Sequence, residues 1–209
     1  HSEAANFSVG ANIGLALFAA NIAGWPEITK SAKAGQDAYK ALKYAPFPVV
    51  GAPSGMALAG GLEILLHCDA VQAHAETYMG LVEVGVGLVP AWGGCKEMML
   101  RNFADPSRAG GPMPPIVKAF EAIGLATVAG SAEEARDLQV LRPGDGISMN
   151  RDRLLADAKA KALALVANYA PPEPVEIPLP GEAAAIALGM VIDGFRKTGK
   201  ATRHDAVVG

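Results

Sequence analysis

Two adjacent glycines followed by an acid constrain this chain more than any other feature. Gly60 and Gly61 stand between a small-residue stretch and a strongly apolar segment, and Glu63 lies three residues after Gly60. Glycine permits backbone dihedrals and close approaches that other residues do not. The pattern predicts a loop that enters a helix, where backbone N–H groups without an internal partner can bind an anion or a developing oxyanion.

The surroundings of Glu63 suit acid–base chemistry. Its apolar neighbours are Leu62, Ile64, Leu65 and Leu66. One helical turn separates Glu63 from Gly60, so its carboxyl group can share the face toward which the free N–H points. A carboxyl group among apolar side chains is a candidate for a raised pKa and for proton transfer. The plainer alternative is a pair of packing glycines and an ordinary acid in the first turn of a helix.

A second acid, Glu83, stands in a similar apolar setting between Val82 and Val84. Burial of this carboxyl group without a partner would be costly. In an extended strand its side chain could instead point to solvent, and this is the alternative interpretation. Two acids in apolar, glycine-rich segments are the pair that adding or removing water requires. A third segment, residues 7–12, is by itself only a small-residue loop.

Strand and helix signals alternate in the first part of the chain, and mostly helical signals follow. Short apolar runs bounded by proline or glycine predict strands at 49–52, 70–73 and 77–80. Spacing, proline and capping signals predict helices at 13–23, 26–44, 116–123, 150–169 and 183–195, with others ending at 66, beginning after 94 and opening at 131. We expect an α/β core over residues 1–130 and a helical C-terminal region over residues 131–209, not two independent domains.

Composition excludes several classes of protein. Hydrophobic residues make up 51% of the chain and charged residues 19%, which excludes a disordered tail. A net charge of −3 offers no basic field for nucleic acid or a membrane surface, and no apolar run is long enough to span a bilayer. The two cysteines form no Cys-x-x-Cys pattern, and the histidines show no metal spacing. We expect no metal and a cytoplasmic location.

Four separated elements together resemble the crotonase, or enoyl-CoA hydratase, superfamily. They are Phe-Ser-Val-Gly-Ala-Asn at 7–12, a Pro-Val strand at 48–50, Gly-x-Ala-x-x-Gly-Gly-x-Glu at 55–63 and Gly-x-x-Glu-x-x-x-Gly-x-x-Pro-x-x-Gly-Gly at 80–94. The resemblance is closest to the hydratase part of bifunctional proteins that also carry a 3-hydroxyacyl-CoA dehydrogenase. It implies an α/β fold of the ClpP/crotonase-like type, a β/α superhelix followed by helices that pack against a neighbouring subunit.

The resemblance also implies a role for each matched residue. The backbone N–H groups of Val9 and Gly60 would hold the thioester carbonyl oxygen, where one donor is worth about 3 kcal/mol of the barrier. Glu63 and Glu83 would bind one water between them. Glu63 would activate this water for attack at C3, and Glu83 would deliver the proton to C2. The residues expected to bind substrate are Phe7, Ala11, Ile13, Pro90, Trp92 and Gly93.

The activity implied by the resemblance is reversible hydration of trans-2-enoyl-CoA to 3-hydroxyacyl-CoA in fatty-acid β-oxidation. CoA enters as part of the substrate, and no separate cofactor is expected. The alternatives are a Δ3–Δ2-enoyl-CoA isomerase that uses a single glutamate, and a non-catalytic module that holds a dehydrogenase partner. The presence of both glutamates favours the hydratase. The family leads us to expect a homo-oligomer, either a trimer or a hexamer, and a fused 3-hydroxyacyl-CoA dehydrogenase portion.

The chain departs from the family pattern at three points. Asn12 stands where the family usually has Asp, and Val82 stands where Pro usually precedes the second glutamate. A complete crotonase domain also has several strands before its first motif, and this chain has almost nothing there. We therefore expect a fragment that lacks its N-terminal strands.

Overall fold

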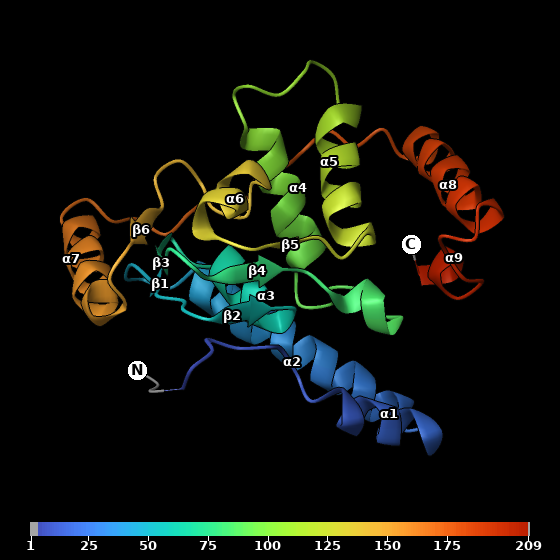
Figure 1. Ribbon diagram of the computed structural model, residues 1–209, viewed down its shortest axis with the longest axis horizontal. Coiled ribbons are helices and arrows are strands. Elements are labelled where there is room, and N and C mark those ends of the chain that lie inside the picture. Colours follow the sequence, from blue (N-terminus) through green and yellow to red (C-terminus); the bar gives the residue numbers. More distant parts are fainter. Residues whose placement is uncertain (1–3, 209) are drawn as a thin grey trace.

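Helix α3 and six short strands form the centre of the computed structural model, which describes residues 4–208 (Figure 1). One sheet has the order β1–β3–β6 with parallel pairing, and the other has the order β2–β4–β5 with β5 antiparallel to β4. The strands are β1 (Val50–Gly51), β2 (Met56–Leu58), β3 (Ala70–His74), β4 (Tyr78–Gly80), β5 (Val128–Ala129) and β6 (Gly146–Ser148).

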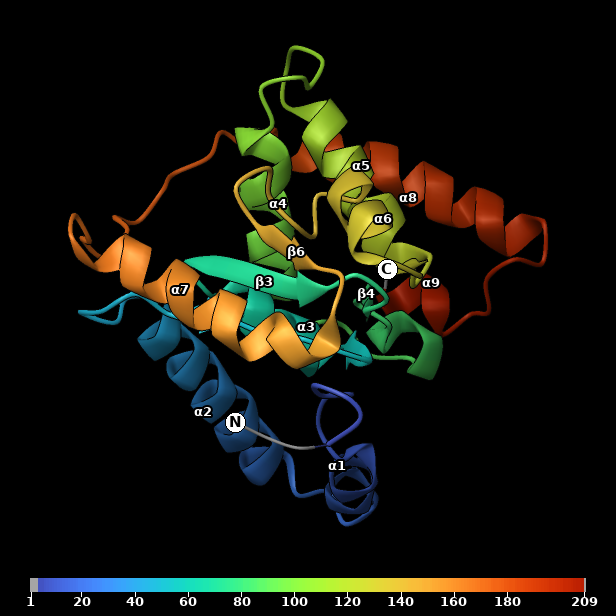
Figure 2. The ribbon, with the colours of Figure 1, turned by 60° about the vertical axis from the view of Figure 1, so that its left-hand side comes forward.

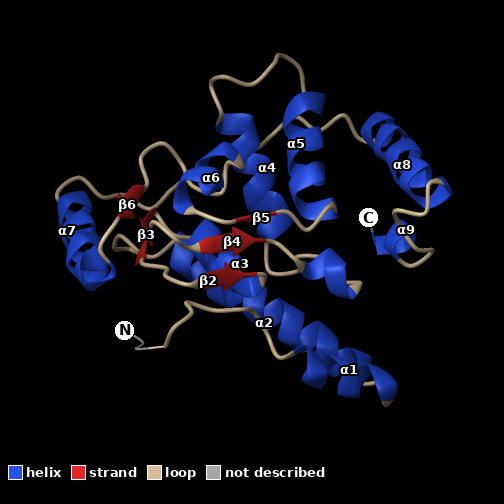
Figure 3. Cartoon of the chain, in the orientation of Figure 1, coloured by secondary structure: helices blue, strands red, loops and turns tan. Residues whose placement is uncertain are grey.

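Helices cover the strands from several sides (Figure 3). Helix α2 lies along one side of the strands, and α4, α5 and α6 lie along the other (Figures 1 and 2). The helices are α1 (Ile13–Asn21), α2 (Trp25–Lys43), α3 (Gly60–Leu66), α4 (Gly94–Ala104), α5 (Met113–Gly124), α6 (Ala132–Asp137), α7 (Leu154–Val166), α8 (Glu182–Lys197) and α9 (Asp205–Val208). Two 3₁₀ turns, η1 (Glu83–Val86) and η2 (Arg151–Arg153), complete the set.

Local chemistry explains where several helices begin. The Asn12 side chain accepts the Gly14 N–H at the start of α1, and Ser131 accepts the Glu134 N–H at the start of α6. Pro26 stands in the first turn of α2, where its missing N–H would have no partner in any case. Short helix α3 lies between strands, because parallel strands need a crossover connection. It carries the chain from β1 and β2 toward β3 and β4.

Most of the predicted elements are confirmed, and three strands were missed. Strands β1, β3 and β4 lie where the sequence predicted them. Strand β2 occupies the first part of a stretch that was expected to pass from glycine-rich loop to helix. Strands β5 and β6 are too short to show an alternating pattern, and tertiary pairing creates them. The helix expected at 150–169 begins as η2 and continues as α7 to Val166.

Strand β6 corrects the expectation of an all-helical C-terminal region. It pairs in parallel with β3, and Gln72 on β3 donates to the Ser148 hydroxyl at 2.9 Å. Helix α7 packs against β3 beside it (Figure 2). Residues 146–166 therefore extend the sheet and its cover, whereas α8 buries only Ala184.

The core lies between α3, the two sheets and α4. Its most buried large side chains include Leu62, Leu65, Val71, Met79, Met98 and Leu141. Arg101 of α4 crosses this region and donates to the carbonyl groups of Val140 (2.6 Å) and Leu66 (3.3 Å). The buried guanidinium thus ties α3 to the segment after α6, which fixes α3 in place. Among the described residues, no helix combines the length and hydropathy needed to span a membrane.

Candidate active site

The segment before α1 runs beside β2 and reaches the start of α3. Ser8 donates its N–H to Met56 (3.0 Å) and accepts the N–H of Leu58 (2.9 Å), so it pairs in parallel with Ala57. In such a pairing the N–H of the next residue points away from the partner strand. The N–H of Val9 therefore faces away from β2, and the Val9 side chain is 57% exposed.

The two neighbours of Val9 in the chain, Ser8 and Gly10, lie against the glycine pair at the start of α3. A methyl group built on Gly10 would lie 3.2 Å from the Gly60 nitrogen. The same construction on Gly61 would overlap the Ser8 carbonyl group. These contacts show that the segment packs directly against the first turn of α3. Neither the Val9 nor the Gly60 N–H has an acceptor among residues 4–208.

A strained residue directs the Gly60 N–H. Ala59 joins β2 to α3 with φ +51° and ψ −127°, a conformation that suits glycine and is unfavourable for alanine. Its own N–H donates to the Gly80 carbonyl at 2.9 Å, and its carbonyl accepts the Glu63 N–H at 3.0 Å. The ψ angle of Ala59 sets the orientation of the next peptide. The surrounding structure therefore holds the Gly60 N–H at the open end of α3.

Glu63 is buried and held by the turn before α4. Glu63 is only 2% exposed. One carboxyl oxygen, Oε1, accepts the N–H groups of Trp92 (2.9 Å) and Gly94 (2.8 Å). Burial raises the pKa of Glu63, and these two hydrogen bonds partly oppose that rise. The Glu63 carboxyl group is therefore fixed through Oε1, and its other oxygen, Oε2, takes part in neither of these hydrogen bonds.

Glu83 lies in η1, not in an extended strand. Its Oε2 atom is buried and has no hydrogen-bond partner in the described part of the chain. The interpretation in which this side chain points to solvent is therefore wrong, because a 3₁₀ turn replaces the strand and turns the carboxyl group inward. Burial and, second, the charge of Glu63 raise the pKa of Glu83 to about 7. The two carboxyl groups are thus electrostatic neighbours.

The other expected substrate residues divide into two groups. Pro90, Trp92 and Gly93 lie in the turn that holds Glu63, and Trp92 makes one of its hydrogen bonds. Phe7 packs against the core, whereas Ala11 and Ile13 are exposed at the start of α1. Sequence motifs thus located the turn and the first strand-like segment.

Sequence analysis missed a polar cluster beneath this site. Lys43 of α2 binds Glu97 of α4 at 2.7 Å, and His67, the residue that follows α3, lies 3.6 Å from the same carboxyl group. Burial lowers the pKa of His67, so its ring is neutral and this contact is not an ion pair. The His67 Nδ1 atom lies 2.7 Å from the Glu63 carbonyl oxygen. No sequence motif indicates this cluster, because its members come from α2, from the residue that follows α3 and from α4.

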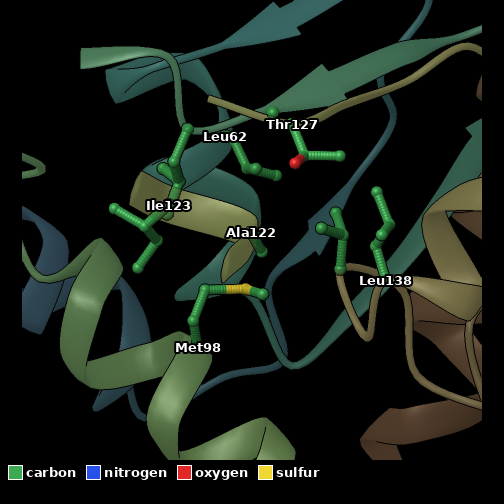
Figure 4. Close-up of a pocket in the computed structure, with 9 residues that line it drawn as sticks. Leu62, Met98, Ala122, Ile123, Thr127 and Leu138 are labelled. Carbon is green, nitrogen blue, oxygen red and sulfur yellow. The ribbon is translucent and has the colours of Figure 1, made fainter. Parts of the chain in front are cut away.

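Two cavities lie elsewhere in the molecule. An apolar void of about 10 Å³ is lined by Leu62, Met98 and Ile123 among others, and Figure 4 shows these side chains around it. It has room for about one water and none for an acyl chain. An open groove of about 320 Å³ lies over α5 and α6. Neither is lined by Glu63 or Glu83, and no group of three metal-ligating side chains occurs within residues 4–208.

Glu83→Gln removes a pH-dependent loss of stability. Folding raises the pKa of the Glu83 carboxyl group from 4.5 to about 7, so ionising this group costs more free energy in the folded state than in the unfolded state. The free energy of unfolding of the wild type therefore falls as pH rises from about 4.5 to about 7, by about 1–2 kcal/mol for this partly solvated group. Urea unfolding at about pH 5 and about pH 8 measures it. If the free energy of unfolding changed equally with pH in the wild type and in Glu83→Gln, the raised pKa of Glu83 would be contradicted.

Comparison with known proteins gives the same picture of the fold. Residues 5–109 match the family described as enoyl-CoA hydratase/isomerase. The crystal structure of an enoyl-CoA hydratase from Polaromonas sp. JS666 superimposes with a TM-score of 0.59 at 21% identity, over 98% of this chain and 67% of that one. A putative enoyl-CoA hydratase/isomerase (crotonase) from Legionella pneumophila gives a TM-score of 0.63 at 18% identity, over 93% and 71%. These structures show the crotonase fold.

Two curated relatives are much longer than this chain. A probable 3-hydroxyacyl-CoA dehydrogenase of Bacillus subtilis is 38% identical over 98% of this chain, which covers 26% of that protein. A putative fatty acid oxidation complex trifunctional enzyme of Rickettsia felis is 38% identical over 49% of this chain, which covers 14% of that protein. The matched part of the chain thus spans about a quarter or less of the length of these two relatives.

Proposed function

This chain belongs to the enoyl-CoA hydratase/isomerase family, and we propose that it carries the hydratase site of a fatty-acid oxidation enzyme. The reaction is the reversible addition of water to trans-2-enoyl-CoA. One observation supports it most: two inward-facing carboxyl groups with raised pKa values neighbour each other near the N-terminus of α3, where the N–H groups of Val9 and Gly60 have no acceptor within residues 4–208. Water addition needs a base, an acid and an oxyanion site together.

Each residue has one task in the proposed reaction. The N–H groups of Val9 and Gly60 bind the thioester oxygen and stabilise the negative charge that develops on it. Ionised Glu63 takes a proton from water while the water oxygen bonds to C3 and the C2–C3 π electrons move toward the thioester. Protonated Glu83 then delivers its proton to C2. The cycle closes when a proton passes from Glu63 back to Glu83, so no net proton is consumed.

The electrostatics favour this division of labour. Oε1 of Glu63 accepts two N–H groups, which stabilise the ionised form that a base requires. Glu83 has an oxygen without such donors and a pKa of about 7, so it holds a proton near neutral pH. The reaction needs no separate cofactor, because CoA enters with the substrate.

The longer relatives support a larger assembly. The B. subtilis protein is named a probable 3-hydroxyacyl-CoA dehydrogenase, and we propose that this chain is likewise joined to such a portion. That portion would oxidise the hydroxyl group that hydration creates. We also propose a trimer or hexamer, as the resemblance implies. The exposed apolar side chains of α8, Ile186, Met190 and Val191, are ones that a neighbouring subunit would cover.

Crotonyl-CoA hydration tests the proposal. We expect the absorbance of the conjugated thioester to fall and mass spectrometry to identify 3-hydroxybutyryl-CoA. A 3-enoyl-CoA assayed in parallel separates the alternatives. If conjugated thioester forms from the 3-enoyl-CoA while crotonyl-CoA stays unchanged, the protein is an isomerase. If both esters bind and neither reacts, it is a non-catalytic module.

Hydration should slow above about pH 7. The active form of the glutamate pair carries one proton, so kcat/KM falls up to tenfold per pH unit once that proton is lost from Glu83. Dehydration of 3-hydroxybutyryl-CoA provides the control. Because the overall equilibrium involves no net proton, both directions must show the same alkaline limb. A hydration rate that stays constant well above the pKa of Glu83 would exclude it as the proton donor.

A further inference from the structure

A tyrosine on α2 contacts both halves of the proposed site. The hydroxyl group of Tyr39 donates to the Gly60 carbonyl at 3.0 Å. Its ring meets the Trp92 indole edge-on, with centroids 5.4 Å apart, and lies 5.6 Å from the His67 ring. One side chain thus touches the start of α3 and the turn that holds Glu63.

The start of α3 needs such support. Ala59 is strained, and the two following glycines have no side chains with which to anchor their peptides. Rotation of the Ala59–Gly60 peptide would relieve the strain and turn the Gly60 N–H away from its present direction. The Tyr39 hydroxyl group is hydrogen-bonded to the Gly60 carbonyl, which belongs to the next peptide. This hydrogen bond opposes the rotation. Burial and the nearby Glu63 raise the pKa of Tyr39 to about 12, so the hydroxyl group keeps its proton.

The turn before α4 is fastened to the same helix. A methyl group on Gly35 would overlap the Trp92 indole, so the ring rests directly on the α2 backbone. The side chain of the next residue, Gln36, donates to the Ala91 carbonyl at 2.9 Å. The six-membered ring of the indole lies against Gly60, where an added methyl group would be 3.0 Å from the nearest ring atom. Trp92 is therefore packed between α2 and the N-terminus of α3.

We propose that Tyr39 is a positioning residue that holds the Gly60 N–H and the Glu63-binding turn in one common geometry. The inference rests on the proposed function, because it assigns Tyr39 to the oxyanion donor and the base of that reaction. Tyr39 touches neither the substrate nor the reacting atoms. Its effect passes through a peptide orientation, so its loss should lower kcat more than it changes KM.

Tyr39→Phe isolates the hydroxyl group, because the ring that supports Trp92 and His67 remains. We expect kcat for crotonyl-CoA hydration to fall about tenfold with KM within about twofold, as for the loss of one hydrogen bond. Tyr44→Phe is the matched control, since Tyr44 caps the same helix and its hydroxyl group bonds to none of the described residues. It should leave both constants unchanged.

A spectroscopic measurement separates positioning from general stability. Butyryl-CoA has no C2–C3 double bond and cannot be hydrated, so it can be observed bound. In the wild type, hydrogen bonds from Val9 and Gly60 should lower the thioester carbonyl stretching frequency, measured by isotope-edited infrared difference spectroscopy. In Tyr39→Phe the frequency should return part of the way toward that of the free ester, and in Tyr44→Phe it should not move.

The outcomes distinguish this inference from the function on which it rests. If the wild type hydrates crotonyl-CoA and Tyr39→Phe keeps the wild-type kcat and carbonyl frequency, the role of Tyr39 is overturned and the hydratase stands. If the wild type does not hydrate crotonyl-CoA, the function fails, and the carbonyl frequencies still decide whether Tyr39 orients the donors. If butyryl-CoA binds without any frequency shift in the wild type, the oxyanion role of the Val9 and Gly60 N–H groups is overturned, and the role of Tyr39 with it, while the crotonyl-CoA assay alone decides the hydratase.

Discussion

Glu63→Gln and Glu83→Gln should each lower kcat for crotonyl-CoA hydration by about a thousandfold. Glutamine matches the shape of glutamate but can neither take a proton from water nor supply one to C2. In Glu63→Gln, the amide oxygen can still accept the N–H groups of Trp92 and Gly94, so the fold around it is kept. In Glu83→Gln, a neutral side chain replaces one that is already half neutral near pH 7. The expected loss of kcat therefore comes from the loss of proton transfer and not from a change in the fold.

The double variant provides a sharper criterion. Because both carboxyl groups act in one proton circuit, Glu63→Gln/Glu83→Gln should be about as slow as either single variant. Initial rates with crotonyl-CoA, at enzyme concentrations high enough to follow slow turnover, measure all three. Glu76→Gln is the control, since Glu76 is exposed and its carboxyl group has no recorded hydrogen bond among the described residues. Full 3-enoyl-CoA isomerisation by either single variant would argue for the isomerase.

Sequence patterns indicated the candidate reactive groups because the positions of those groups depend on local backbone. The glycine pair, Glu63 and Glu83 stand at fixed short spacings, and the start of a helix at Gly60 follows from the flanking residues. The conformation of the Glu83 segment was not predicted. Val82 and Val84 suggested a strand, and packing replaced it with a 3₁₀ turn.

The support around the reactive groups could not be predicted from sequence. Tyr39 meets Gly60 across 21 positions of the chain, and Lys43 meets Glu97 across 54. Nothing in an amphipathic helix marks which of its polar residues will face another helix. The same holds for β6, whose three residues form a strand only because β3 offers an open edge. Contacts between residues that are far apart in the sequence determine both β6 and the cluster around Glu97, so neither was predicted.

Gly61→Ala should lower both stability and activity. A methyl group at this position would overlap the Ser8 carbonyl group, and the obstacle is backbone that a rotamer change cannot remove. Ser8 is itself held by two hydrogen bonds to β2, at 3.0 Å and 2.9 Å. Either α3 or the Ser8 segment must move, and we expect about 2–3 kcal/mol of destabilisation from this overpacking.

The loss of activity should exceed what unfolding explains. Movement between Ser8 and Gly61 would separate the Val9 and Gly60 N–H groups, which must both reach one oxygen in the proposed reaction. Misplacing one donor of such a pair costs about a hundredfold in kcat. Thermal unfolding and crotonyl-CoA kinetics, measured well below the transition, distinguish the two effects.

Gly110→Ala is the matched control for Gly61→Ala, because a methyl group on Gly110 would meet no atom within 4 Å. It should leave the melting temperature and kcat near the wild-type values. A Gly61→Ala protein that melts earlier yet keeps its kcat would show that the spacing of Val9 and Gly60 does not matter to the reaction. That result would remove the oxyanion site from the mechanism while leaving the two glutamates in place. The glycine pair would then be required only for packing, and the rate would depend on the carboxyl groups alone.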